Sequence, residues 1–268
     1  MTGFLLPDEQ TLCDRFVADQ WLILPVDDTD ALTRIRDRAA ALASGHLGLP
    51  LPNDPQHFLD RIGDRVTPAG LNDLRLAVIQ GLNAEPWFRT SYHALARKAL
   101  ATVVGNELVM QRTVGLSVQL PGDDSSLLPL HSDVWDGDSP YEVVLWLPLV
   151  DCFGTKSMCI LPPAANAKAR DNLKDFADRT VDDLFTAVEP DLVWLDVPYG
   201  HFLLFSQNLL HGNRINREPA TRWSMNCRFK SLFSPYADKR LGEFFEPITL
   251  RPATRLGLDF RFPDGFHD

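Results

Sequence analysis

Short apolar segments separated by Pro, Gly and Asp fill most of the chain after Gly105. These segments lie at 107–120, 142–150, 157–161, 202–205 and 221–229. Such a succession of short strands is typical of a β-sandwich or barrel, because a βαβ sheet would place a helix after each strand. We therefore predict a fold that is mainly β, with its core in residues 105–235.

The residues before this β region have a helical pattern. Apolar residues recur at helical spacing in 8–20, 28–44, 68–82 and 86–104, and one strand-like segment lies at 21–26. A chain of 268 residues suits one domain with a sizeable core. We therefore expect a single domain over 1–268. Its parts are a mostly helical N-terminal layer at 1–104, the β core at 105–235 with a helical insertion at 163–190, and a C-terminal extension at 236–268.

Composition and charge exclude several classes of partner. The chain is 45% hydrophobic but has no apolar run of about 18 residues, so we expect no membrane-spanning helix. A net charge of −10 disfavours non-specific binding to nucleic acid or to an anionic membrane surface. The start resembles no secretory signal, and the four cysteines lack CxxC spacing, which predicts free thiols in a reducing cytoplasm. The expected partner is a small molecule, and the oligomeric state is left open.

One histidine stands two residues before an acid, in His131-Ser132-Asp133. With 36 acids among 268 positions, seven histidines give about one such pair by chance. The spacing alone therefore does not indicate a metal site, and the flanking sequence has to support it. Residues two apart on an extended chain point to the same side, so the imidazole and carboxylate could share a metal ion. His211, after the apolar run at 202–205, is the leading third ligand. Two histidines and one carboxylate form the facial triad of non-haem Fe(II) oxygenases. The alternative is a capping or core role for His211.

The segment at 221–229 alternates apolar and polar residues with a period of two. One face of the predicted strand carries Trp223, Met225, Cys227 and Phe229, and the other carries Arg222, Ser224, Asn226 and Arg228. The polar face could be solvated. If the apolar face packs against the helical layer, however, the polar face lines the inside of a barrel. Two arginines there would require an anionic occupant.

Several motifs occur in order along the β region. They are His-Ser-Asp-Val-Trp at 131–135, the strand at 143–151, Ile-Leu-Pro-Pro at 160–163, Gly-His-Phe-Leu-Leu-Phe at 200–205, and His-Gly-Asn at 211–213. Arg222 follows His211 by eleven positions. This set resembles the Fe(II)/2-oxoglutarate-dependent oxygenases of the phytanoyl-CoA-hydroxylase-like superfamily. Segments 139–150 and 226–236 are similar to oxygenases of bacterial carbohydrate-biosynthesis clusters. The resemblance covers about residues 105–235 and implies a double-stranded β-helix core of the jelly-roll or cupin-like kind.

The resemblance implies a role for each residue of the predicted site. Fe(II) would be held by His131, Asp133 and His211. The cosubstrate 2-oxoglutarate would pair its distal carboxylate with Arg222, a planar bidentate donor. Its further contacts would be Ser224, Asn213 and Gln119. The implied reaction consumes O₂, releases succinate and CO₂, and oxidises a C–H bond of the substrate, with hydroxylation as the default outcome.

The substrate is less well defined than the metal site. Polar and aromatic residues that could contact a sugar or another polar, anionic metabolite are Trp135, Asp136, Tyr141, Asn226 and Arg228. Alternatively, Arg228 pairs with Glu243 or Glu246 and only holds the C-terminal segment. Two other functions compete with the oxygenase. One is a cupin-like metal-dependent sugar isomerase or epimerase, which would not need Arg222. The other is a non-catalytic carbohydrate-binding barrel, in which His131 and His211 are structural.

Overall fold

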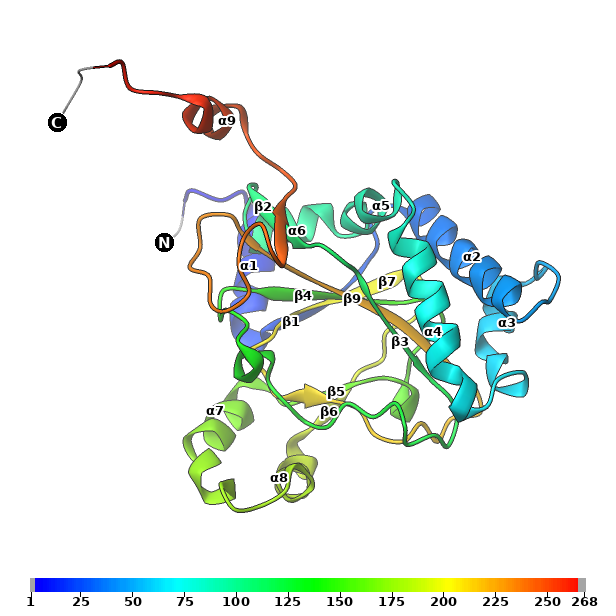
Figure 1. Ribbon diagram of the computed structural model, residues 1–268. Helices are drawn as coiled ribbons and strands as arrows, with labels where there is room; N and C mark the ends of the chain where they lie inside the picture. Colours follow the sequence, from blue (N-terminus) through cyan, green and yellow to red (C-terminus); the bar gives the residue numbers. More distant parts are fainter. Residues whose placement is uncertain (1–2, 265–268) are drawn as a thin grey trace.

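The computed structural model describes residues 3–264 (Figure 1). Its helices are α1 (Pro7–Asp19), α2 (Thr29–His46), α3 (Pro55–Asp60), α4 (Pro68–Asn83), α5 (Phe88–Ala94), α6 (Arg97–Val103), α7 (Pro163–Asp171), α8 (Val181–Val188) and α9 (Pro252–Asp259). Its strands are β1 (Trp21–Pro25), β2 (Leu108–Gln111), β3 (Gly115–Gln119), β4 (Val143–Pro148), β5 (Cys159–Ile160), β6 (Val193–Trp194), β7 (His201–Ser206), β8 (His211–Gly212), β9 (Arg222–Ser231) and β10 (Phe245–Pro247).

The first four helices, α1 to α4, begin at recognisable N-terminal signals. The carboxylate of Asp28 accepts a hydrogen bond from the Ala31 N–H and caps α2, while α1, α3 and α4 begin at a proline. The helix expected at 86–104 is interrupted between α5 and α6. The reason is a tertiary contact: the Asp27 N–H donates to the Leu95 carbonyl, and the Asp27 carboxylate accepts from the Lys98 N–H.

The strands within residues 3–264 form two antiparallel sheets. The larger has seven strands, with the order β1-β7-β4-β9-β2-β10 and with β3 also paired to β9. The smaller has the order β6-β5-β8. The strands β6, β8 and β10 have only two or three residues each, so they are too short to show a period of two in the sequence.

Strand β9 lies inside the larger sheet and has two different faces. Its apolar side chains are at most 1% exposed, and they share one core cluster with residues of α2 and α4. The indole N–H of Trp223 donates to the Leu59 carbonyl at 2.9 Å, which ties β9 to α3. Because side chains alternate along a strand, the polar residues of β9 point away from these helices.

The segment at 163–190 and the residues after β10 lie outside the larger sheet, whereas β10, within the predicted C-terminal extension, pairs with β2 at its edge. The helical insertion predicted at 163–190 consists of two helices, α7 and α8, joined through a 3₁₀ turn at Leu173–Phe176. They pack on a second apolar cluster with residues of β5 and the segment before β8. Helix α9 stands away from the sheets (Figure 1). No helix within residues 3–264 is long and apolar enough to span a membrane.

Candidate metal and cosubstrate site

A cavity of about 190 Å³ lies between the two sheets. The larger sheet contributes residues of β3, β4, β7 and β9 to its walls, and the smaller sheet contributes β8. The lining residues are Ser117, Leu128, His131, Asp133, Val144, Trp146, Met158, Phe205, His211, Gly212, Asn213, Arg222, Ser224, Asn226 and Arg228. The four polar residues predicted on one face of β9, Arg222, Ser224, Asn226 and Arg228, therefore border one cavity together with the three predicted metal ligands.

Backbone pairing brings the two histidines of this set together. The N–H of each of His131 and His211 donates to the carbonyl of the other at 2.9 Å, and their ring centroids are 4.4 Å apart. Close approach of the chain at Gly212 supports this pairing. A Cβ at Gly212 would lie 2.9 Å from the Leu128 carbonyl oxygen, so a larger residue would push the segments apart.

The three side chains present their free donor atoms to one point. The Oδ1 atom of Asp133 lies 3.3 Å from Nε2 of His131 and 3.8 Å from Nε2 of His211. The Nδ1 atoms of the two histidines donate to the carbonyls of Pro129 and Leu209, which leaves Nε2 as the metal-facing nitrogen. The ligand atoms all lie within 4.8 Å of one another. Two imidazoles and one carboxylate in this arrangement suit a divalent metal such as Fe(II).

The environment of the three side chains favours a state that can bind a metal. Burial opposes ionisation of Asp133, but the hydrogen bond from His131 and the charges around it lower the pKa of Asp133 to about 2. Burial lowers the pKa of His211 to about 4, so this imidazole is neutral near pH 7. Burial acts in the same sense on His131, but the hydrogen bonds to Asp133 and Pro129 and the charges of Asp133 and Asp136 together outweigh it and raise the His131 pKa. A metal ion would compete with protons for this imidazole.

Arg222 is a buried cation that lacks an acidic partner among residues 3–264. Its Nη1 donates to the Ser157 carbonyl at 3.1 Å and its Nη2 to the Ser117 hydroxyl at 3.0 Å. Burial lowers the pKa of Arg222 to about 10, so the side chain is still charged near pH 7. Within the described chain, Nε of Arg222 and the hydroxyl of Ser224 are buried without hydrogen-bond partners. These free groups fit a carboxylate ligand, which would supply both charge and acceptors.

The other predicted cosubstrate contacts differ in their placement. Asn213 lines the cavity, and its Oδ1 accepts from the Leu128 N–H at 2.7 Å, so this oxygen holds the loop before His131. Gln119 is buried but does not line the cavity, and its Nε2 donates to the Arg214 carbonyl at 2.7 Å. Ser117 takes the place beside Arg222 instead. The strand pattern contained this signal, because Ser117 lies two residues before Gln119 and directly opposite Ser224.

The predicted substrate contacts are also divided. Asn226 and Arg228 line the cavity. Trp135 is 47% exposed and lines a different groove, next to α7, while Tyr141 is 57% exposed and lies beside β4. Asp136 is exposed and lines neither the cavity nor that groove. The structure therefore places none of these three loop residues on the cavity wall, although the charge of Asp136 contributes to the raised pKa of His131.

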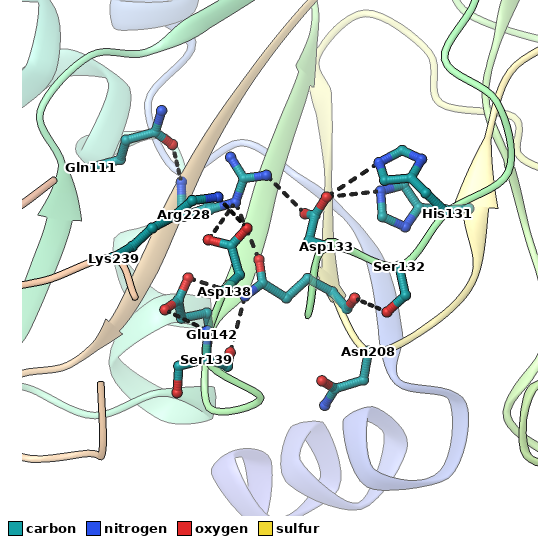
Figure 2. A network of polar contacts seen from close by, with 12 residues as sticks. Gln111, His131, Ser132, Asp133, Asp138, Ser139, Glu142, Asn208, Arg228 and Lys239 are labelled. Carbon is teal, nitrogen blue, oxygen red and sulfur yellow. Dashed lines mark hydrogen bonds and ion pairs between the residues drawn. The ribbon is translucent and has the colours of Figure 1, made fainter. Parts of the chain in front are cut away.

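Arg228 forms ion pairs that the sequence did not indicate. Its Nη2 lies 3.1 Å from Oδ2 of Asp133, and its Nε lies 3.4 Å from Oδ1 of Asp138 (Figure 2). Glu246 pairs instead with Arg89 and Arg112. The alternative in which Arg228 pairs with Glu246 is therefore wrong in its partner: β10 presents that carboxylate to other arginines, and Arg228 pairs with two aspartates instead.

Glu142 lies in the same polar network and is 1% exposed (Figure 2). Its carboxylate accepts from the Ser139 N–H and from Nε2 of Gln207, each at 3.0 Å. Burial, together with the nearby Asp138 carboxylate, raises the pKa of Glu142 from 4.5 to about 7. The folded protein therefore binds this proton more tightly than the unfolded chain does. The resulting stabilisation is fully present below about pH 4.5 and is lost as the pH rises through 7.

We therefore expect the free energy of unfolding to fall by about 2 kcal/mol as the pH rises from 5.5 to 8.5 and Glu142 loses its proton. Urea denaturation at the two pH values measures this change. Glu142→Gln removes the titrating group, so its stability should fall less over the same range. The exposed Glu189→Gln serves as the matched control and should behave as the parent does. Equal pH dependence in the parent and Glu142→Gln would contradict the assignment.

No protein-family model matches this chain, and no curated protein matches it by sequence. Solved structures do match it. The chain is similar to the nickel complex of the non-haem monooxygenase ThoJ, at 17% identity and a TM-score of 0.57 over 95% of this chain and 89% of that one. EctD from S. alaskensis, with 2-oxoglutarate and 5-hydroxyectoine, has 16% identity and a TM-score of 0.54 over 88% of this chain and 80% of that one. HygX from Streptomyces hygroscopicus, with nickel and 2-oxoglutarate bound, has 15% identity and a TM-score of 0.52 over 88% of this chain and 90% of that one.

At identities of 15–17%, these likenesses show a shared fold. They agree with the two antiparallel sheets described above and identify the architecture as a jelly-roll with added helices. Because one fold can carry unrelated functions, the activity has to be argued from the site itself.

Proposed function

We propose that this protein is an Fe(II)- and 2-oxoglutarate-dependent dioxygenase that oxidises a C–H bond of a polar small molecule, with hydroxylation as the default outcome. One observation carries the proposal. The same cavity holds two histidines and a carboxylate with converging donor atoms, and a buried arginine that has no acidic partner within residues 3–264. A metal site alone fits many activities, but the second feature calls for an anionic cosubstrate beside the metal.

Each residue has a role in the proposed site. His131, Asp133 and His211 would hold Fe(II). Bound Fe(II) with 2-oxoglutarate and O₂ would supply the oxidation of the substrate, coupled to release of succinate and CO₂. Arg222 would bind the distal carboxylate of 2-oxoglutarate, and the free hydroxyl of Ser224 would donate a second hydrogen bond.

The remaining walls of the cavity would exclude water and hold the loops in place. Val144, Trp146 and Phe205 line it with apolar surface, which strengthens the electrostatic contacts made inside. Asn213 would act by holding the loop at Leu128. We assign Gln119 to the support of the 214 segment rather than to the cosubstrate, because its amide donates there.

The charges of the cavity suggest the class of substrate. Arg222 would be neutralised by the cosubstrate, and Arg228 is already paired with Asp133 and Asp138. No other Lys or Arg lines the cavity within the described chain. We therefore propose that the part of the substrate that enters is polar but uncharged, such as a hydroxyl-bearing face of a sugar or sugar-derived metabolite. Asn226 would be its hydrogen-bonding contact.

The two competing functions explain less of the site. A metal-dependent sugar isomerase or epimerase would use the triad but would leave the charge of Arg222 uncompensated. A non-catalytic carbohydrate-binding barrel would leave the converging donors of the triad without a function as well. Burying an unpaired arginine is costly, so a role that supplies its partner is favoured.

We also propose that the chain acts as one domain in the cytoplasm. One apolar cluster contains residues of α2, α4, β4 and β9, so the helical and β regions have a common core. The four cysteines are free, which fits a reducing compartment.

The direct test is succinate formation from 2-oxoglutarate in air with added Fe(II) and ascorbate. We expect succinate formation that depends on added iron and disappears with a chelator, because turnover of 2-oxoglutarate would require Fe(II) bound to the triad. Quantification by mass spectrometry measures it. In parallel, calorimetry with Ni²⁺ as a redox-inert metal should show 2-oxoglutarate binding only when the metal is present. Absence of both succinate and metal-dependent binding would reject the oxygenase.

A substrate panel tests the proposed charge. Uncharged sugars and polyols should stimulate succinate formation more than matched sugar acids or phosphosugars do. The reason is that a second anion would meet no unpaired cation in the cavity. Stimulation by the anionic members alone would contradict the uncharged assignment but leave the oxygenase proposal intact.

A further inference from the structure

The two carboxylate oxygens of Asp133 face different partners. Oδ1 is the atom near both histidine Nε2 atoms, at 3.3 and 3.8 Å. Oδ2 points the other way and lies 3.1 Å from Nη2 of Arg228. Figure 2 shows the Asp133 carboxylate between the imidazole of His131 on one side and the guanidinium of Arg228 on the other. Only Oδ1 is thus directed to the point where the three ligands converge.

Arg228 is itself fixed by contacts on several sides. Its Nε faces Oδ1 of Asp138 at 3.4 Å and Oε1 of Gln207 at 3.2 Å. Its backbone N–H donates to the side chain of Gln111 at 3.2 Å. Asp138 has a fully buried side chain, and its Oδ2 accepts from Lys239. The guanidinium therefore has little freedom to leave Asp133.

A second route joins this network to the same loop. The Ser132 hydroxyl, between the two ligands of the His-x-Asp motif, donates to the Gln207 carbonyl at 2.9 Å. The Gln207 side chain accepts from Arg228 and donates to Glu142. The Ser132 hydroxyl and the Asp133 carboxylate of the motif are thus both tied to one polar network, which is completed by Lys239 of the C-terminal segment.

We propose that Arg228 is a positioning residue for the metal site: it holds Asp133 so that one oxygen alone is available to the metal, and the pair Asp138–Lys239 holds Arg228. The inference rests on the proposed function, because it takes the triad as a metal site. A carboxylate restricted to one oxygen uses one coordination position instead of two. Such supporting contacts commonly change metal affinity by about 10- to 100-fold.

The test measures metal binding without 2-oxoglutarate. The variants are Arg228→Met, which removes the contact, and Arg228→Lys, whose point charge cannot reach both carboxylates as the planar fork does. Asp138→Asn weakens the support of Arg228 and keeps its contact with Asp133. Arg61→Met is the matched control, since Arg61 forms an exposed ion pair with Asp64. Calorimetry gives the Ni²⁺ affinity, and the visible absorption of bound Co²⁺ reports the coordination number.

We expect Arg228→Met to bind Ni²⁺ about 10- to 100-fold more weakly than the parent. The Ni²⁺ affinities of Arg228→Lys and Asp138→Asn should lie between those of Arg228→Met and the parent, and the affinity of Arg61→Met should equal that of the parent. The Co²⁺ band of Arg228→Met should also weaken, because a carboxylate that binds through both oxygens raises the coordination number. A role limited to folding would lower the melting temperature and leave the Co²⁺ band of the folded protein unchanged.

The outcomes separate this inference from the proposed function. Parent-like Ni²⁺ affinity and Co²⁺ spectrum in Arg228→Met would overturn the positioning role, while the metal site would stand. If Arg228→Met does not fold, Asp138→Asn and Arg228→Lys provide the test. Parent-like Ni²⁺ affinity and Co²⁺ spectra in both of these variants would overturn the positioning role. Failure of the parent itself to bind Ni²⁺ or Co²⁺ would reject the metal site and hence the proposed function.

Discussion

Replacement of His211 by Ala is expected to abolish iron-dependent succinate formation. His211 supplies one of three converging donor atoms, and two remaining ligands hold a divalent metal poorly. We expect the turnover of 2-oxoglutarate to fall by a factor on the order of a thousand, equivalent to several kcal/mol of lost metal-dependent stabilisation. Succinate formation with saturating Fe(II), together with Ni²⁺ affinity, measures the effect.

The fold should tolerate this change in His211. Its backbone contacts with His131 do not involve the side chain, so circular dichroism should stay close to that of the parent. His57→Ala is a suitable control, because His57 is exposed on α3 and does not line the cavity. An unchanged succinate rate in His211→Ala would remove this residue from the site.

Replacement of Arg222 by Met should weaken 2-oxoglutarate binding by roughly 30- to 1000-fold. The estimate corresponds to the loss of a buried charge-assisted contact of about 2–4 kcal/mol. Arg222→Lys should also bind poorly, since an ammonium group cannot reproduce the planar fork or the contact to the Ser117 hydroxyl at the same time. Titration of 2-oxoglutarate into the Ni²⁺-loaded protein measures the dissociation constant.

The metal affinity provides the control for Arg222. Arg222 is not among the three proposed metal ligands, so Arg222→Met should bind Ni²⁺ alone as tightly as the parent does. This is the opposite of the result expected for Arg228→Met. Parent-like binding of 2-oxoglutarate to Arg222→Met would show that the cosubstrate carboxylate is bound elsewhere.

Much of the architecture was predictable from local patterns. The structure has α1, α2 and α4 within two residues of the segments with helical periodicity, and β9 where the residues alternate. Local patterns did not reveal the break between α5 and α6, because it depends on Asp27, a residue about 70 positions earlier in the chain. The strands β6 and β8 were missed for a related reason. At two residues each, they exist only through their pairing with β5.

The candidate site was predictable where local geometry controls the direction of side chains. A spacing of two directs His131 and Asp133 to one side of the chain, and the same period places Arg222 and Ser224 on one face of β9. The position of His211 after the apolar run at 202–205 made it the leading third ligand, and the resemblance to a known superfamily implied the same role. Sequence proximity misled for Trp135 and Tyr141, because the loop after Asp133 turns through a short helix and leads them away from the cavity.

The sequence by itself determined the strand and helix types, the alternation of β9 and the chemical groups available to a site. These properties follow from the preferences and the repeat of neighbouring residues. Only the tertiary structure decided which groups meet. Arg222 is left without an acid in the described chain, whereas Arg228, six residues further along the same face, lies between Asp133 and Asp138. That difference arises because an ion pair depends on distances of 3–4 Å between remote segments, and the packing of the two sheets and the C-terminal segment sets those distances.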